Sequence, residues 1–221
     1  MTTSGTKTNI RLSTMLSTGS EIIRKEGISA LFKHFISIIF MNEEILIFQK
    51  PLKSIAEVEP SLDNFALKVI STKKDLTDLI KNGFDMSFFN AYELQRRVEQ
   101  GEVLFAGFVG DLLVHKSCVL MHATPTIDSP IPIDWSKEAY IQFVETAPRY
   151  RGRHIYPFVS SQVFEYARER GKSVCTTSTT TKNISSQRAH RRAGYRVCGR
   201  GRYLRLFLFF EFWRDLRKTV V

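Results

Sequence analysis

Cysteine is scarce in this sequence, and long apolar runs are missing from it. The three cysteines, Cys118, Cys175 and Cys198, are odd in number and widely spaced, which predicts neither a disulfide framework nor a zinc site. No segment offers the roughly 20 successive apolar residues of a membrane-spanning helix. Residues 1–20 also lack the apolar core of a signal peptide. We therefore expect a cytoplasmic protein without a bound metal, either soluble or peripheral at a membrane.

Acidic residues are almost missing from one stretch of the chain. Residues 148–202 hold 13 Lys or Arg but only Glu165 and Glu169, a local net charge of +11 in a chain whose total is +10. Such concentration indicates an anionic ligand near one site rather than a general solubility effect. Nucleotide phosphates, an acidic carrier protein or a membrane surface would fit. A nucleic acid is disfavoured, because no recognised nucleic-acid-binding module accompanies the charge.

The N-terminal part is organised differently from the rest. Residues 1–20 are rich in Ser and Thr and predict a disordered tail. Apolar residues at helical spacing predict an amphipathic helix over 20–41, whose apolar face packs on the main domain, forms a homodimer or contacts a membrane surface. A strand is expected at 44–49, ending before Pro51, and a linker at 57–64. The predicted division is 1–20, 21–60 and a main domain at 61–221.

Regular elements follow one another through the main domain. Helices are expected near 74–81, 91–100, 155–170 and 184–192, the last two ended by Gly171 and Gly194. Strands are expected at 66–72, 102–110, 112–121, 139–146, 173–181, 195–199 and 203–213. Gly110-Asp111 predicts a tight hairpin between the second and third strands. This order predicts an α+β or three-layer α/β fold, with helices covering a sheet.

A basic turn, Arg149-Tyr150-Arg151-Gly152-Arg153-His154, separates the strand 139–146 from the helix that begins near Ile155. Backbone N–H groups that open a helix are unpaired, and the helix dipole adds positive charge to that of the arginines. Such a turn suits a pyrophosphate. Basic turns with a glycine are also common as simple solvated loops.

A second motif makes the pattern specific. Asn183, Ser186, Gly194 and Tyr195 occur at offsets 0, 3, 11 and 12, one strand after the basic turn. Together the two segments resemble the GNAT N-acetyltransferase superfamily, whose cofactor loop reads Q/R-x-x-G-x-G/A and whose later helix begins N-x-x-A/S. The resemblance covers about residues 66–213.

The resemblance implies a GNAT fold and a site for acetyl-CoA. The central sheet would be mixed, mostly antiparallel, and splayed between strands 139–146 and 173–180, the fourth and fifth of the main domain. The pantetheine arm would pair with backbone near Val144 and Thr146, as an added strand does. The other implied acetyl-CoA contacts are Arg149, Arg151, Gly152, Arg153, His154, Ile155, Asn183 and Ser186.

Two histidines depart from the family pattern. His154 stands where the loop has Gly or Ala, and it turns away from the ligand, contacts phosphate or impairs CoA binding. His190 stands where the family has the Tyr that is proposed to protonate the departing thiolate. An imidazolium is a competent proton donor, so His190 either replaces this acid or is structural.

Removal of the amine proton needs a base or a chain of water molecules. Glu138 is 14 residues before Gly152, where the histone-acetylating branch of the family has its glutamate base. Glu145 lies nearer the expected thioester, or it is a strand residue with an ion-pair partner. His115 and His122 are expected on opposite faces of one strand, so at most one faces the cleft.

The predicted function is direct transfer of an acetyl group from acetyl-CoA to a primary amine, with no metal. An amino sugar, a small amine and a protein amine all remain open as the acceptor. Two alternatives also stay open. One is transfer of a longer acyl chain from an acyl carrier protein bound to the run of arginines Arg188, Arg191, Arg192, Arg196, Arg200 and Arg202. The other is a domain that binds CoA or a partner without catalysis.

Overall fold

The computed structural model describes residues 40–124, 131–206 and 210–215. The tail expected at 1–20 and most of the helix expected at 20–41 lie outside the described residues. Where the two overlap the prediction was wrong, because Phe40 and Met41 belong to a strand.

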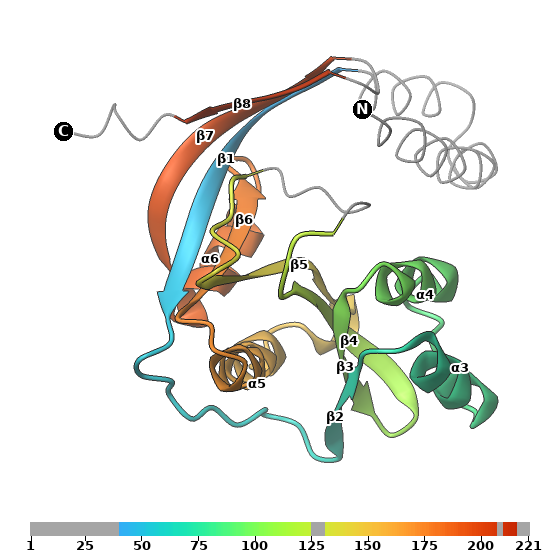
Figure 1. Ribbon diagram of the computed structural model, residues 1–221. Coiled ribbons are helices and arrows are strands. Elements are labelled where there is room, and N and C mark those ends of the chain that lie inside the picture. The colour runs from blue at the N-terminus through green and yellow to red at the C-terminus, as the bar shows by residue number, and fades with distance from the viewer. Residues whose placement is uncertain (1–39, 125–130, 207–209, 216–221) are drawn as a thin grey trace.

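One sheet of eight strands forms the centre of the described structure (Figure 1). Its spatial order is β2-β3-β4-β5-β6-β1-β7-β8, and each adjacent pair is antiparallel except β5 and β6, which are parallel. The strands are β1 (Phe40–Pro51), β2 (Phe65–Ile70), β3 (Val103–Val109), β4 (Leu112–Leu120), β5 (Glu138–Thr146), β6 (Val174–Thr180), β7 (Arg196–Leu206) and β8 (Phe210–Asp215). The mixed, mostly antiparallel sheet confirms the predicted α+β class.

Four described helices cover this sheet from both sides. The helices α3 (Lys73–Lys81) and α4 (Ala91–Glu99) pack on one face, where Leu76 and Leu94 are buried. The helix α5 (Ile155–Glu169) packs on the other face through residues such as Val159 and Val163. The helix α6 (Ile184–Arg192) lies on the α5 side. The result is a three-layer arrangement whose apolar contacts fill both interfaces.

Local sequence signals explain where these helices begin. Thr72 and Asp75 form a reciprocal capping box at the start of α3, and the Asn90 side chain accepts a hydrogen bond from the backbone of Glu93 in α4. Asn183 caps α6 in the same way, with 3.0 Å between its Oδ1 and the Ser186 nitrogen.

The first strand is placed differently from the sequence prediction. The strand expected at 44–49 belonged to the extension before the main domain, whereas β1 pairs with β6 on one side and β7 on the other. Ile45, Ile47 and Phe48 are buried, because both faces of this inner strand are covered. The paired residues are 123 to 166 positions apart, so this pairing has no local signal in the sequence.

The end of the sheet also differs from expectation. Strands were expected at 195–199 and 203–213, but one strand, β7, runs through the expected gap from Arg196 to Leu206, and β8 follows it. Gly201 lies under the Trp213 ring, which a Cβ atom at that position would meet at 2.1 Å. This glycine therefore makes room for a cross-strand aromatic ring within the strand.

Candidate functional site

A splay in the sheet creates the site. The parallel pairing of β5 with β6 runs only from Glu138 with Val174 to Ile141 with Thr177. Phe143 then adopts a positive φ of 54°, and the β4–β5 register shifts nearby, which is the signature of a bulge. Beyond it, the β6-facing edge of β5 has no strand partner among the described residues. The predicted splay between the fourth and fifth strands of the main domain is thus confirmed.

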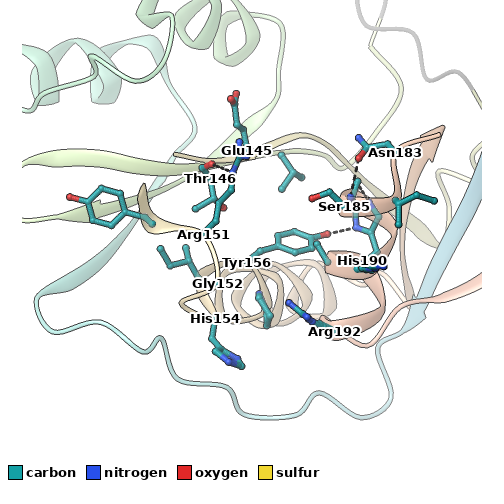
Figure 2. Close-up of a pocket in the computed structure, with 18 residues that line it drawn as sticks. Glu145, Thr146, Arg151, Gly152, His154, Tyr156, Asn183, Ser185, His190 and Arg192 are labelled. Carbon is teal, nitrogen blue, oxygen red and sulfur yellow. Dashed lines mark hydrogen bonds between the residues drawn. The ribbon is translucent and has the colours of Figure 1, made fainter. Parts of the chain in front are cut away.

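A cleft of about 700 Å³ opens between the end of β5, the start of α5 and one face of α6 (Figure 2). Its walls combine backbone, hydroxyl groups and basic side chains. The lining residues that the sequence predicted are Val144, Glu145, Thr146, Arg151, Gly152, His154, Ile155, Asn183, Ser186 and His190. Two segments whose nearest lining residues, Pro157 and Asn183, are 26 positions apart in the chain therefore share one cavity.

Three of the predicted residues lie elsewhere. Arg149 and Arg153 are exposed parts of the same loop but do not line the cleft. Glu138 lies at the start of β5, outside the lining, where its Oε2 accepts hydrogen bonds from the side chains of Gln49 and Thr176. Its carboxylate is thereby tied into the sheet, away from the splay.

The basic loop meets the requirements of an anion site. Gly152 has a φ of 79°, and no atom lies within 4 Å of the position where a Cβ would be, so the loop backbone is open to a ligand. No side chain caps the N-terminus of α5. Arg151 folds back on β5, with 3.0 Å between its Nε and the Thr146 carbonyl oxygen. This contact fixes a guanidinium group between the strand end and the helix start.

His154 occupies the N-cap of α5 in the left-handed conformation, with φ of 57°. The conformation explains why glycine suits this position, and a histidine tolerates it at a cost of about 1 kcal/mol. Its side chain is exposed, and Figure 2 shows the ring directed away from Tyr156 and His190.

Glu145 lies at the edge of the cleft and is ion-paired. Its Oε2 is 3.1 Å from the Nζ of Lys116, whose side chain is buried. The ammonium group also lies 3.5 Å from the centre of the Phe143 ring, a cation–π contact. Burial lowers the pKa of Lys116, and the Glu145 carboxylate opposes that effect.

His190 is held between two hydroxyl groups inside the cleft. Its Nδ1 is 2.7 Å from the Tyr156 hydroxyl and its Nε2 is 2.9 Å from the Ser186 hydroxyl. Burial lowers the pKa of His190 to about 4. The ring is therefore neutral near pH 7, which does not fit the imidazolium donor suggested by the sequence.

A second buried histidine, His115, contacts the end of β5 that lines the cleft. The Nδ1 of His115 is 2.8 Å from the Thr146 hydroxyl, and its Nε2 is 2.9 Å from the Ser117 hydroxyl. Burial, followed by the charge of Lys116, lowers the pKa of His115 to about 3. His122 lies beyond β4 and is exposed, so the expectation of two histidines on one strand was wrong.

The family model for the acetyltransferase (GNAT) family matches residues 105–195, which span every wall of this cleft. Residues 105–195 are therefore similar to a GNAT acetyltransferase domain. Acetyl-CoA-dependent transfer is general for that family. No curated protein matches the chain.

Solved structures similar to this chain agree on the fold. A Drosophila protein has a TM-score of 0.52 at 11% identity, covering 77% of this chain and 53% of its own. The GCN5-related glucosamine N-acetyltransferase region of a fungal multi-domain GH3 β-N-acetylglucosaminidase has a TM-score of 0.50 at 11% identity, covering 81% of this chain and 23% of that protein. This chain thus spans about half of the Drosophila protein and a quarter of the fungal one.

The described residues show neither a metal-binding cluster nor a membrane-spanning helix. No group of three or more His, Cys, Asp or Glu side chains among them is placed to hold a metal ion. None of the helices described is long and apolar enough to cross a membrane.

The sequence analysis missed several lining residues, of which Tyr156 is the most important. It lies directly after the predicted loop, yet its hydroxyl partner is 34 positions away. Arg188 and Arg192 of α6 also line the cleft. The sequence placed them in a run of arginines that could bind the 3′-phosphate of CoA, an acidic carrier protein or nucleic acid, without deciding among these.

Proposed function

We propose that this GNAT domain transfers an acetyl group from acetyl-CoA to a primary amine by direct attack within a ternary complex. The observation that carries the proposal is the cleft itself, in which an unpaired strand edge lies beside an uncapped helix N-terminus.

The donor substrate fits the two ends of this cleft. Its pyrophosphate would accept hydrogen bonds from backbone N–H groups at the start of α5 and from Arg151. The pantetheine amides would pair with the free edge of β5 at Val144 and Thr146, as an added strand does. Exposed Arg188 and Arg192 supply further positive charge at the α6 wall.

The reaction needs a neutral amine and a path for one proton. The nitrogen lone pair attacks the thioester carbonyl carbon, the C–S bond then breaks, and its electron pair leaves on sulfur. The nitrogen loses a proton to a base. Of the two carboxylates considered, only Glu145 borders the cleft, so we propose that it takes this proton directly or through water.

A panel of amines tests the proposal. Purified protein is incubated with acetyl-CoA and an amino sugar such as glucosamine, a polyamine or a peptide amine. Free thiol and acetylated product are then measured together. We expect product from at least one class, and we expect the rate at low acetyl-CoA to fall when Arg151 is replaced by Ala. Thiol release without any acetylated amine would argue against the proposal.

A longer acyl group carried by an acidic protein is the second candidate. The exposed arginines at the mouth of the cleft favour it through charge complementarity. Comparing acetyl-CoA with longer acyl-CoA donors and with acyl carrier protein at two salt concentrations separates the two. Preference for the carrier-bound donor, lost at high salt, would favour the second candidate.

A further inference from the structure

A tyrosine hydroxyl reaches His190 from a different helix. Tyr156 lies in the first turn of α5, whereas His190 lies in the last turn of α6. The Tyr156 hydroxyl is 2.7 Å from Nδ1 of His190, and both side chains line the cleft (Figure 2). A phenol is therefore present beside residue 190, although residue 190 itself is a histidine.

The contacts form a continuous chain of exchangeable protons. Tyr156 hydroxyl, His190 Nδ1, His190 Nε2 and Ser186 hydroxyl follow one another at 2.7 and 2.9 Å across the imidazole. A neutral imidazole donates from one nitrogen and accepts at the other. When Nδ1–H donates to the tyrosine oxygen, Nε2 accepts from Ser186, and the phenolic proton points away from His190. The Tyr156 hydroxyl also interacts with the side chains of Ser160 and Tyr195.

The two ends of this chain differ in their access to solvent. Ser186 is half-buried at the wall of the cleft, while Tyr156 is only 8% exposed. Tyr156 packs edge-on against the His190 ring, with 5.5 Å between ring centres. Ser186 thus exchanges protons with water more readily. Tyr156, at the other end of the hydrogen-bonded chain, is buried and held by packing.

We propose that Tyr156 is the catalytic acid that protonates the departing thiolate, that His190 positions its hydroxyl, and that Ser186 connects the pair to solvent. This inference rests on the proposed function, because it needs CoA in the cleft. It assigns the acid role to a residue on α5 rather than to the histidine at the usual position on α6.

The proton count closes through the chain. The C–S bond breaks with its electron pair on sulfur, and sulfur takes the phenolic proton of Tyr156. The Nδ1 proton of His190 moves to the tyrosine oxygen, and the Ser186 proton moves to Nε2. Water returns a proton to Ser186, and the amine proton that Glu145 takes up passes to water and replaces it. His190 is then neutral in its other tautomer. Before the next turnover, Nε2 gives its proton to water through Ser186, and Nδ1 regains one from water through Tyr156 in the emptied cleft. No charged imidazole forms, in agreement with the burial of the ring.

The test measures the ionisation of bound CoA, which requires no acceptor amine. Ultraviolet thiolate absorbance is followed against pH for CoA bound to the wild-type protein, to Tyr156→Phe and to Tyr166→Phe. Tyr166 is the matched control, because it lies on the same helix but outside the cleft, packed against Phe105 and Arg170.

A hydrogen bond from a hydroxyl stabilises the thiolate, so Tyr156→Phe should leave about tenfold less thiolate at a given pH. Tyr166→Phe should behave as the wild-type protein does. If CoA binds and the three thiolate titrations coincide, the acid role of Tyr156 is overturned while the proposed function stands. If CoA does not bind the wild-type protein, the proposed function fails and the inference fails with it.

A kinetic comparison separates acid catalysis from a packing role. An oxygen ester analogue of acetyl-CoA has a poorer leaving group and depends more on protonation. Tyr156→Phe should therefore lower kcat for the oxygen ester more than for the thioester, with KM little changed. An equal loss for both donors would show that Tyr156 only maintains the shape of the cleft.

Discussion

Arg151 and Arg153 lie in one loop, and the sequence predicts that both contact acetyl-CoA. In the structure only Arg151 of the two lines the cleft, and it donates a hydrogen bond to the Thr146 carbonyl oxygen at 3.0 Å. Arg153 is exposed and outside the lining. Replacing each by Ala tests which guanidinium binds the phosphates of CoA.

The expected magnitude follows from these contacts. A hydrogen bond to a charged group contributes about 1.5–3 kcal/mol, and exposure to solvent favours the lower end of that range. Arg151→Ala should therefore raise the Kd for CoA roughly tenfold to thirtyfold, since about 1.4 kcal/mol is a factor of ten. Arg153→Ala keeps the cleft intact, and long-range attraction alone should change the Kd by no more than about threefold.

Calorimetric titration with CoA measures both values, and thermal unfolding of the free proteins controls for stability. Neither exposed side chain should change Tm appreciably. Arg151→Lys adds a useful intermediate, because it keeps the charge but loses the planar fork that reaches Thr146. An Arg153→Ala protein that binds CoA as weakly as Arg151→Ala, or more weakly, would refute the assignment.

Two further predictions concern the glycine of the loop and the buried histidines. Gly152→Ala and Gly171→Ala impose the same backbone strain, because φ is 79° and 80° and no atom lies near either Cβ position. Thermal unfolding should therefore show equal losses in the free energy of unfolding, of about 1 kcal/mol. Only Gly152→Ala should also weaken CoA binding; a loss of binding in Gly171→Ala would contradict this. Burial lowers the pKa of His115 to about 3 and of His190 to about 4, below the ordinary 6.5, so the unfolded chain takes up protons first as pH falls. Urea unfolding should show stability declining below about pH 6.5, by about 2 kcal/mol per histidine at about pH 5, and His190→Phe should lose about half of that dependence; an unchanged dependence would contradict it.

Most of the fold could be predicted because its signals are local. Thr72 with Asp75, and the glycines after α5 and α6, mark helix ends through groups only a few residues apart. Gly110 with its positive φ gave the β3–β4 hairpin. Periodicity predicted the strands themselves but not which strands pair with one another in the sheet. The insertion of β1 between β6 and β7 therefore lay beyond the sequence prediction.

Part of the candidate site could likewise be predicted from local sequence, and part of it depends on the tertiary structure. The loop around Gly152 and the helix begun by Asn183 were found from spacing, because an anion site at a helix start is made by consecutive residues. Which arginine turns inward depends on the position of the Thr146 carbonyl oxygen, and that position depends on the bulge at Phe143. The choice between Glu138 and Glu145 also depends on the tertiary structure, because only the placed strand shows that Glu145 borders the cleft and Glu138 does not.

By itself the sequence determined the α+β class, the basic loop, the helix of the second motif and the resemblance to the GNAT superfamily, since each is written in residues close along the chain. Only the tertiary structure decided that His190 is buried and neutral, and that a hydroxyl from Tyr156 on another helix lies at its Nδ1. The physical reason is that ionisation and hydrogen bonding depend on what surrounds a group in space, and those surroundings come from segments that the chain order keeps apart.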